Sequence, residues 1–323
     1  MKAIVTGGAG FVGFSVVSKL HSDGWEVLVL DNFSRGSARF LHSCGALRDV
    51  PIEEIALEDE SSFQAAVARF AGSGKIDAIW HLAANSDIPA GAADPRIDLR
   101  DTFLTTFNAL LVAKRFEIPR FVFASSSAVY GDFGDVRIRE DSGPLLPLSN
   151  YGAMKLASEA QVSASAESFL EAALIIRFPN VVGTPATHGV IHDFVKKLQR
   201  SPSLLEVLGN GTQQKAYLHV DDLVDAMFYL NEQHDDGIEI FNVGPEDDGI
   251  TVKEIAELVV AQVSPGAEIR FGHGDRGWIG DVPRFRYSID KLKAAGWSRS
   301  PSSRDAVRRA VQEIAEEADG VHR

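Results

Sequence analysis

The stretch TGGAGFVG, residues 6–13, decides the fold class of this chain. It follows an apolar run at residues 3–5 and precedes a helical pattern that begins at Phe11 and ends at Ser22. Glycine permits a tight turn and lets the backbone approach a phosphate closely, and the helix N-terminus supplies amide donors and a positive dipole end. We therefore expect a strand–loop–helix unit that binds the pyrophosphate of a dinucleotide. The residues expected to contact it are Gly7, Gly10, Phe11, Val12 and Gly13.

The second β-rich run supports this interpretation because it ends in Leu30-Asp31-Asn32. A carboxylate at Asp31 is placed to accept hydrogen bonds from the adenosine ribose hydroxyls, and it would repel a 2′-phosphate. Asp31 and Asn32 therefore predict NAD rather than NADP, although Arg35 nearby weakens that preference. The alternative is a glycine-rich turn followed by a surface carboxylate.

Strand and helix patterns alternate through the first half of the chain, which predicts an α/β fold with a Rossmann-type doubly wound parallel sheet. The order changes after Phe178. We expect residues 1–178 to form the NAD-binding domain, with residues of about 215–245 returning to it. Residues 179–323 are expected to form a smaller, interleaved substrate-binding region. The expected strands are residues 3–6, 26–30, 52–57, 76–80, 120–124 and 172–177, and the expected helices are residues 11–22, 61–70, 95–116, 151–170, 189–200, 220–232, 251–263 and 302–318.

The composition limits the possible partners. The chain has 323 residues, 45% of them hydrophobic, and a net charge of −13. Such an acidic protein is a poor ligand for nucleic acid or an anionic membrane. The single cysteine, Cys44, fits a reducing compartment, and the strand-like run directly after Met1 leaves no room for a signal peptide. We expect a cytoplasmic protein without a membrane span or a metal site.

The segment YGAMK, residues 151–155, carries the chemistry that we expect. Tyr151 and Lys155 are four residues apart and therefore share one face of a helix. A free tyrosine is a poor base at neutral pH because its pKa is about 10. A neighbouring ammonium and an oxidised nicotinamide ring would both favour the phenolate. Tyr151 is therefore predicted to be the base, next to the cofactor's nicotinamide ring; the alternative is an amphipathic helix with a surface lysine.

Seven motifs together resemble the extended short-chain dehydrogenase/reductases, specifically their NAD-dependent nucleotide-sugar epimerase/dehydratase group. In chain order they are TGGAGFVG, HLAAN at 81–85, SSSAVYG at 125–131, YGAMKLASE at 151–159, RFPNVVG at 177–183, HVDD at 219–222 and RGWIGDVP at 276–283. The resemblance extends from Ala3 to about Trp297.

The resemblance implies roles for further residues. It makes Ser126 the catalytic hydroxyl, and it leaves Ser125 and Ser127 to serve the backbone or the cofactor. Two departures from the family pattern are Lys215-Ala216, where the family has Arg-Asp, and Ala56, where it has an adenine-binding Asp. Glu58 and Asp59 lie near that second position, and Ser86, Asp87 and His188 are candidates to line the sugar pocket. The resemblance implies that Lys155 also contacts the cofactor. Further implied cofactor contacts are Leu82, Ala83 and Ala84, and implied substrate contacts are Ser86, Ser126, Ser127, Asn180, Lys215 and Arg276.

The pair Ser127-Ala128 separates members of this group. Nucleotide-sugar 4,6-dehydratases of the family have Asp-Glu there, and its decarboxylating members keep the second acid. Serine and alanine cannot transfer protons in this way at neutral pH. The sequence therefore predicts a 4-epimerase that acts on a nucleotide-diphosphate sugar. The alternatives are a nucleotide-sugar dehydrogenase or keto-sugar reductase and a non-catalytic NAD-binding regulatory protein.

The resemblance also implies a homodimer that pairs two long helices from each subunit, here residues 95–116 and 151–170. Alanines at positions 153, 157, 160 and 164 would allow close approach of the second helix. They would equally suit packing on the chain's own sheet.

Overall fold

The glycine-rich stretch lies between a buried strand and a helix in the computed structural model of this chain. The structure describes residues 1–72, 74–274, 286, 288–299 and 302–320. Strand β1 (Lys2–Thr6) ends where the loop begins, and helix α1 (Phe11–Ser22) has the bounds that the sequence predicts. Val16, Val17 and Leu20 are the apolar side chains that α1 buries.

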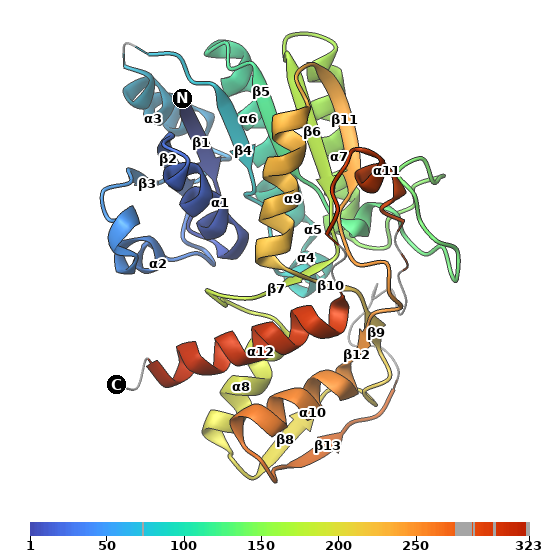
Figure 1. Ribbon diagram of the computed structural model, residues 1–323. Helices are drawn as coiled ribbons and strands as arrows, with labels where there is room; N and C mark the ends of the chain where they lie inside the picture. Colours follow the sequence, from blue (N-terminus) through green and yellow to red (C-terminus); the bar gives the residue numbers. More distant parts are fainter. Residues whose placement is uncertain (73, 275–285, 287, 300–301, 321–323) are drawn as a thin grey trace. The chain divides into compact units, whose positions relative to one another are not determined.

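Within those described residues, a seven-stranded sheet has the order β11-β6-β5-β4-β1-β2-β3. β4 is the central strand of the seven, and β1 beside it pairs in parallel with both β2 and β4 (Figure 1). This confirms the predicted doubly wound parallel sheet. The other strands are β2 (Glu26–Asp31), β3 (Ile52–Glu54), β4 (Ala78–His81), β5 (Arg120–Ala124), β6 (Ala172–Arg177) and β11 (Gly237–Asn242).

Helices cover both faces of this sheet (Figure 1). α1 and α9 (Val220–Gln233) lie on one face, where Phe228 stacks on Trp80 of β4. α3 (Glu60–Ala71), α6 (Thr105–Arg115) and α7 (Asn150–Ala166) lie on the other face and share one apolar core with the strands. The short elements are α2 (Ala38–Ser43), α4 (Ile88–Ala93), α5 (Pro95–Asp98) and two 3₁₀ turns, η1 (Gly45–Leu47) and η3 (Ser127–Val129).

The segment predicted as one helix from residue 95 to 116 has a different structure. α5 ends at Asp98, a π-helical stretch η2 (Leu99–Leu104) follows, and α6 then begins at Thr105. The hydroxyl of Thr102 accepts a hydrogen bond from the N–H of Asn85 at 3.1 Å. Asn85 belongs to the segment after β4. The apolar periodicity of residues 95–116 therefore could not reveal this contact.

The chain divides into two compact units. The first contains Met1–Gly131, Pro144–Arg177 and Ala226–Phe241, and the second contains Asp132–Gly143, Phe178–Asp225 and Asn242–Arg323. In the second unit, α8 (Val190–Arg200), α10 (Val252–Val263) and α12 (Ser303–Gly320) surround one apolar core. Its remaining elements are β7 (Asn180–Val182), β8 (Leu204–Val207), β9 (Gln214–Lys215), β10 (Tyr217–His219), β12 (Ile250–Thr251), β13 (Glu268–Phe271) and α11 (Asp290–Ala294).

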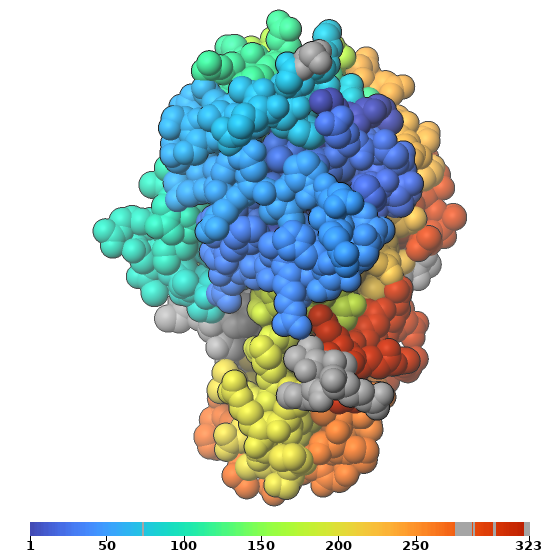
Figure 2. All heavy atoms as spheres, turned by 90° about the vertical axis from the view of Figure 1, so that its left-hand side faces the viewer, coloured from blue at the N-terminus to red at the C-terminus, as the bar shows by residue number. Residues whose placement is uncertain are grey.

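Strand β3 forms one edge of the sheet. It lies at a surface of the first unit that N-terminal residues make up. In Figure 2 these residues are the blue atoms that face the viewer. An uncovered edge strand invites pairing with other chains, and β3 is only three residues long, which limits that risk. Among the described residues, no helix combines the length and the apolar character that crossing a membrane would need.

Candidate active site

The loop after β1 has a geometry that only glycine allows at two places. Gly7 has a φ of +69°, and a Cβ added there would lie 2.8 Å from the backbone nitrogen of Ala83. A Cβ at Gly13 would lie 2.0 Å from the carbonyl oxygen of Gly7. The loop is therefore packed backbone to backbone against the segment that follows β4, and this segment includes the predicted cofactor residues Leu82 and Ala84.

The N-terminus of α1 is open to an anion. Its N-cap residue, Gly10, has no side chain that could occupy the first-turn amides, which include those of Phe11 and Val12. A 12-residue helix presents both these donors and the positive end of its dipole to a phosphate group. The loop and the helix end therefore form a cradle that fits a dinucleotide pyrophosphate.

Asp31 stands at the end of β2, next to this cradle. Asp31 is 7% exposed, and its carboxylate accepts hydrogen bonds from the N–H groups of Ala9 at 3.1 Å and Phe33 at 2.9 Å. Burial raises the pKa of Asp31 above its ordinary value, and these N–H groups act in the opposite direction. An ionised carboxylate has further lone pairs, so Asp31 can still accept bonds from ribose hydroxyls.

Two neighbours of Asp31 are engaged within the protein. The side chain of Asn32 accepts a hydrogen bond from the N–H of Ser34 at 3.0 Å. Arg35, the residue that weakened the preference for NAD, forms an ion pair with Asp87. Asp87 also caps α4 by accepting a bond from the N–H of Ala90. The residues around Asp31 thus fit a dinucleotide with an unmodified ribose.

The three predicted catalytic residues meet at the carboxyl end of β5. Ser126 begins the η3 turn, and its hydroxyl accepts a hydrogen bond from the N–H of Ala128 at 3.2 Å. The same hydroxyl is hydrogen-bonded to Tyr151 on α7. Lys155 is 1% exposed, and its Nζ lies 5.9 Å from the centre of the Tyr151 ring. The predicted spacing therefore places Tyr151 and Lys155 on one helix face beside Ser126.

The electrostatics of Tyr151 differ from what its spacing to Lys155 suggests. Burial raises the pKa of Tyr151 to about 12, and the hydrogen bond from Ser126 lowers it by less than burial raises it. Burial also lowers the pKa of Lys155 to about 7. The ammonium of Lys155 therefore does not by itself bring Tyr151 into a working range. A further positive charge near Tyr151 is needed to favour the phenolate.

A buried carboxyl group also raises the pKa of Tyr151. Asp98, at the end of α5, has a fully buried residue and raises the pKa of Tyr151. Its Oδ1 accepts a hydrogen bond from Asn85 at 2.8 Å, and its Oδ2 has no hydrogen-bond partner among the described residues. No role was expected for Asp98, which lies in none of the seven motifs, or for Asn85, which is the last residue of the motif HLAAN.

The hydroxyl of Ser125 has a partner within the protein. It donates a hydrogen bond to the carboxylate of Glu159, which in turn binds Arg177. Both charged residues belong to motifs quoted above, Glu159 at the end of YGAMKLASE and Arg177 at the start of RFPNVVG, but neither was expected to have a role in the site. One signal was available: Glu159 follows Lys155 by four residues, so it shares the helix face of Tyr151 and Lys155.

His81, the last residue of β4, lies in the same core. Thr106 donates its hydroxyl proton to the carbonyl of Thr102, so its oxygen must accept from Nε2 of His81, 3.0 Å away. Nδ1 is then the acceptor for the hydroxyl of Thr6, at 2.7 Å. Burial holds the pKa of His81 well below its usual range, and the positive charge of Lys155 adds to this effect. His81 is therefore neutral and fixed in one tautomer.

The predicted substrate residues are distributed over both units. Ser86 is exposed just after β4, and Ser127 lies in η3. In the second unit, the side chain of Asn180 points to the carbonyl oxygen of Ala216 at 3.5 Å, next to Lys215 in β9. Asn180 and Lys215 are thus close to each other. Arg276 lies outside the described residues.

Two other residues that the sequence singled out, Asp59 and His188, make hydrogen bonds within the protein. Asp59 accepts hydrogen bonds from the N–H groups of Ser61 and Ser62 and so caps α3, which leaves it less available to an adenine ring. His188 shares a hydrogen bond with Thr187 at 2.8 Å. Among the described residues, no group of three or more His, Cys, Asp or Glu side chains is arranged to hold a metal ion.

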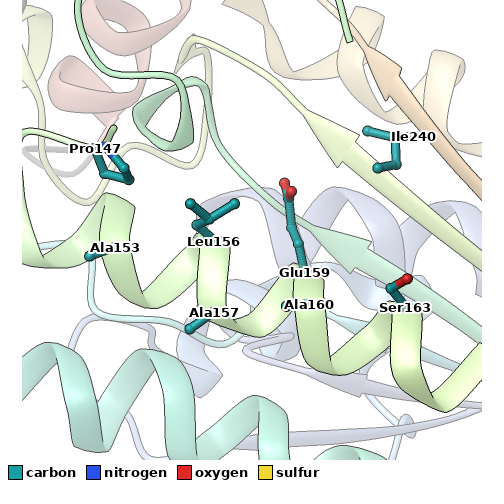
Figure 3. Close-up of a pocket in the computed structure, with 8 residues that line it drawn as sticks. All are labelled: Pro147, Ala153, Leu156, Ala157, Glu159, Ala160, Ser163 and Ile240. Atoms are coloured by element: carbon teal, nitrogen blue, oxygen red, sulfur yellow. The ribbon is translucent and has the colours of Figure 1, made fainter. Parts of the chain in front are cut away.

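A shallow apolar hollow of about 500 Å³ lies along α7, beside Ile240 of β11. Leu156 lies at its centre, and Glu159 and Ile240 border it (Figure 3). Three of the four alanines predicted for close helix approach line it, and Ala164 is exposed further along α7. The lining residues are Pro147, Ala153, Leu156, Ala157, Glu159, Ala160, Ser163 and Ile240.

Comparison with known proteins supports the predicted resemblance. Residues 3–244 match a family described as the NAD dependent epimerase/dehydratase family. A putative UDP-glucose 4-epimerase of Methanocaldococcus jannaschii is 26% identical over 95% of this chain and 96% of its own length. A UDP-N-acetyl-alpha-D-glucosaminuronate decarboxylase of Bacillus cytotoxicus is 29% identical over 90% of each chain. The crystal structure of a UDP-galactose 4-epimerase superposes with a TM-score of 0.84 and 34% identity, covering 98% of this chain and 99% of the other.

Proposed function

This chain belongs to the NAD dependent epimerase/dehydratase family, and we propose that within it the chain is a nucleotide-sugar 4-epimerase that acts by transient oxidation at carbon 4. The observation that carries the proposal is the grouping of Ser126, Tyr151 and Lys155 at the end of β5, with Ala128 beside them. NAD, when bound, supplies the acceptor and donor of the hydride and, in its oxidised form, a positive ring.

Each residue of this group has a role in the proposed reaction. Ser126 hydrogen-bonds the sugar oxygen at carbon 4 and orients it toward Tyr151. The Tyr151 phenolate takes the hydroxyl proton and returns it at the end of the cycle. Lys155 is the donor next to Tyr151 that contacts the nicotinamide ribose. The glycine loop and Asp31 of the first unit would hold NAD, and Leu82, Ala83 and Ala84 are further predicted contacts.

Ser127 and Ala128 favour epimerisation over the other reactions of relatives. Elimination of water needs an acid and a base beside the new ketone, and these two side chains provide neither. Asp98 and Glu159 are carboxyl groups of the first unit near these residues, but both are buried and neither can contact a sugar in this arrangement. The decarboxylase of Bacillus cytotoxicus therefore resembles this chain in overall sequence rather than in the chemistry that we propose.

The proposed substrate is a UDP-hexose. All three relatives described above have names that refer to a UDP-sugar, although their overall identities are modest. In the second unit, Asn180 and Lys215 would bind the phosphates of this substrate; Ser86 in the first unit stays a predicted sugar contact, and Arg276 a predicted phosphate contact outside the described residues. A lysine binds phosphate as a point charge rather than as the bidentate donor that an arginine provides. Cytoplasmic location stays a prediction from the sequence.

Interconversion without added cofactor is the direct test. Purified protein would be incubated in D₂O with UDP-glucose, UDP-galactose and their N-acetyl forms, and the anomeric and H4 signals would be followed by proton NMR. We expect a pair of sugars to interconvert while hydrogen is kept at carbon 4, because hydride rather than a proton is exchanged there. Stoichiometric NADH with an accumulating keto-sugar would favour the dehydrogenase alternative.

We also propose that the chain forms a homodimer through η2, α6 and α7. Leu99, Leu104 and Phe107 are large apolar side chains on the first two elements that are at least 36% exposed. The apolar hollow of Figure 3 lies on the third element. Exposed apolar surface of this kind is typical of an interface. Light scattering that gives the mass of one chain at micromolar concentration would contradict the proposal.

A further inference from the structure

Two charged side chains of the first unit are buried directly behind the proposed catalytic residues. Glu159 follows Lys155 by one turn on the inner face of α7, and Arg177 is the last residue of β6. Their side chains are 5% and 3% exposed. Arg177 binds the carboxylate with two parallel hydrogen bonds, from Nε to Oε1 at 2.9 Å and from Nη2 to Oε2 at 2.6 Å.

Stability alone does not explain this pair. A buried ion pair contributes little more than well-packed apolar side chains of the same volume would. Both partners also reach further groups: Oε1 of Glu159 accepts the hydroxyl of Ser125 at 2.5 Å, and Nη1 of Arg177 donates to the hydroxyl of Tyr130 at 3.0 Å. The pair therefore joins α7 to the segments that leave β5 and β6.

Ser125 connects the pair to the proposed catalytic residues. The carbonyl of the preceding residue, Ala124, accepts a hydrogen bond from Nζ of Lys155 at 2.7 Å. The following residue, Ser126, is hydrogen-bonded to Tyr151. The N–H of Ser125 donates to the carbonyl of Ile176 at 2.8 Å, immediately before Arg177. The backbone from residue 124 to 126 is thus fixed from two sides.

The charge of Glu159 also acts on Lys155. Burial favours the neutral amine of Lys155, and the negative charge of Glu159 opposes that effect and favours the ammonium. The ammonium is the form in which Lys155 can stabilise a phenolate. The charged and titratable groups around this part of the site are Tyr151 and Glu159 on α7, His81 on β4, Asp98 on α5 and Arg177 on β6.

We infer that Glu159 and Arg177 are positioning residues of the active site: through Ser125 they hold the end of β5 against α7, and the carboxylate of Glu159, one helical turn from Lys155, favours its ammonium form. The inference rests on the proposed function for the reaction that these residues serve. The contacts of Glu159 and Arg177, however, lie within this chain, and the effect of Glu159 on Lys155 can be measured without that reaction.

A pair of serine variants tests the positioning role. Ser125→Ala removes the hydroxyl that binds Glu159, whereas Ser158→Ala removes an equally buried hydroxyl of α7 that has no partner among the described residues. We expect Ser125→Ala to lower kcat about tenfold with KM and NAD content unchanged, since small displacements of reacting groups have large effects. Ser158→Ala should keep kcat within about twofold. Equal kcat values for the two variants would overturn the inference.

A titration of Lys155 tests the charge role without any turnover. The ¹⁵Nζ signal of Lys155, assigned through Lys155→Arg, would be followed against pH in lysine-labelled protein. The wild type should titrate near the pKa of about 7. Glu159→Gln keeps the shape but removes the charge, so its midpoint should fall by about one pH unit. An unchanged midpoint would overturn the inference.

The double variant Glu159→Gln, Arg177→Met covers the case in which Glu159→Gln alone does not fold because Arg177 is left unpaired. It removes both charges, so its midpoint should lie below that of the wild type but above that of a folded single variant. A midpoint equal to that of the wild type contradicts the inference. A wild-type protein without epimerase activity would refute the proposed function instead, and the Lys155 titration would still be readable.

Discussion

Gly7→Ala should destabilise the first unit much more than Gly24→Ala does. Both glycines have a left-handed backbone, with φ of +69° and +80°. An alanine in that conformation costs about 1–2 kcal/mol. A Cβ at Gly24 has nothing within 4 Å, whereas a Cβ at Gly7 would lie 2.8 Å and 2.9 Å from backbone atoms of Ala83. Backbone cannot rotate away, so Gly7→Ala carries a further overpacking cost of about 1–3 kcal/mol.

The total for Gly7→Ala is therefore about 2–5 kcal/mol, against about 1–2 kcal/mol for Gly24→Ala. Urea unfolding followed by circular dichroism measures both values, and comparing the two variants cancels their shared backbone cost. NAD content after purification should fall for Gly7→Ala alone, because the loop can no longer lie against the segment after β4. Equal stability of the two variants would refute the close contact between that loop and Ala83.

Three further predictions concern single residues. Tyr151→Phe should lower kcat by about 10²–10⁴-fold with NAD content unchanged, and turnover within a few-fold of wild type would exclude the base role. Buried His81 has a lowered pKa in the folded state, so the stability that it contributes is present above about pH 6.5 and lost as pH falls. The unfolding free energy should therefore drop by up to about 1.4 kcal/mol per pH unit between pH 6 and 5, and His81→Asn should flatten that slope in denaturant titrations. Asp31→Ser should weaken NAD binding about tenfold and improve the ratio of NADP to NAD affinity; calorimetry that finds no change in this ratio would contradict its ribose role.

Local patterns in the sequence predicted the parts of the fold that depend on local contacts. The helix from Phe11 to Ser22 has its predicted bounds because a glycine N-cap and a regular apolar face define it. The helix from residue 151 was predicted to reach 170, but it ends at Ala166. Its last carbonyls accept from Glu167, Phe169 and Leu170 in a turn that apolar periodicity does not distinguish from another helical turn.

The candidate site was predictable only where its residues form a motif along the chain. Tyr151 and Lys155 form such a motif, and a single connection from the end of β5 to α7 separates them from Ser126 along the chain. Arg177 and Asp98 come from other elements, and only folding brings them near Tyr151. The raised pKa of Tyr151 has the same origin, because burial is a property of the packed structure rather than of helix spacing.

Strand β11 has a consequence for how the protein is made. It completes the sheet beside β6, and the N–H of Gly237 bonds back to the carbonyl of Glu171. Until residues 226–241 have left the ribosome, β6 is an open edge of an otherwise finished sheet, and such an edge can pair with another nascent chain. The cofactor loop at the N-terminus is thus synthesised first, yet its unit cannot close until the ribosome has passed Phe241.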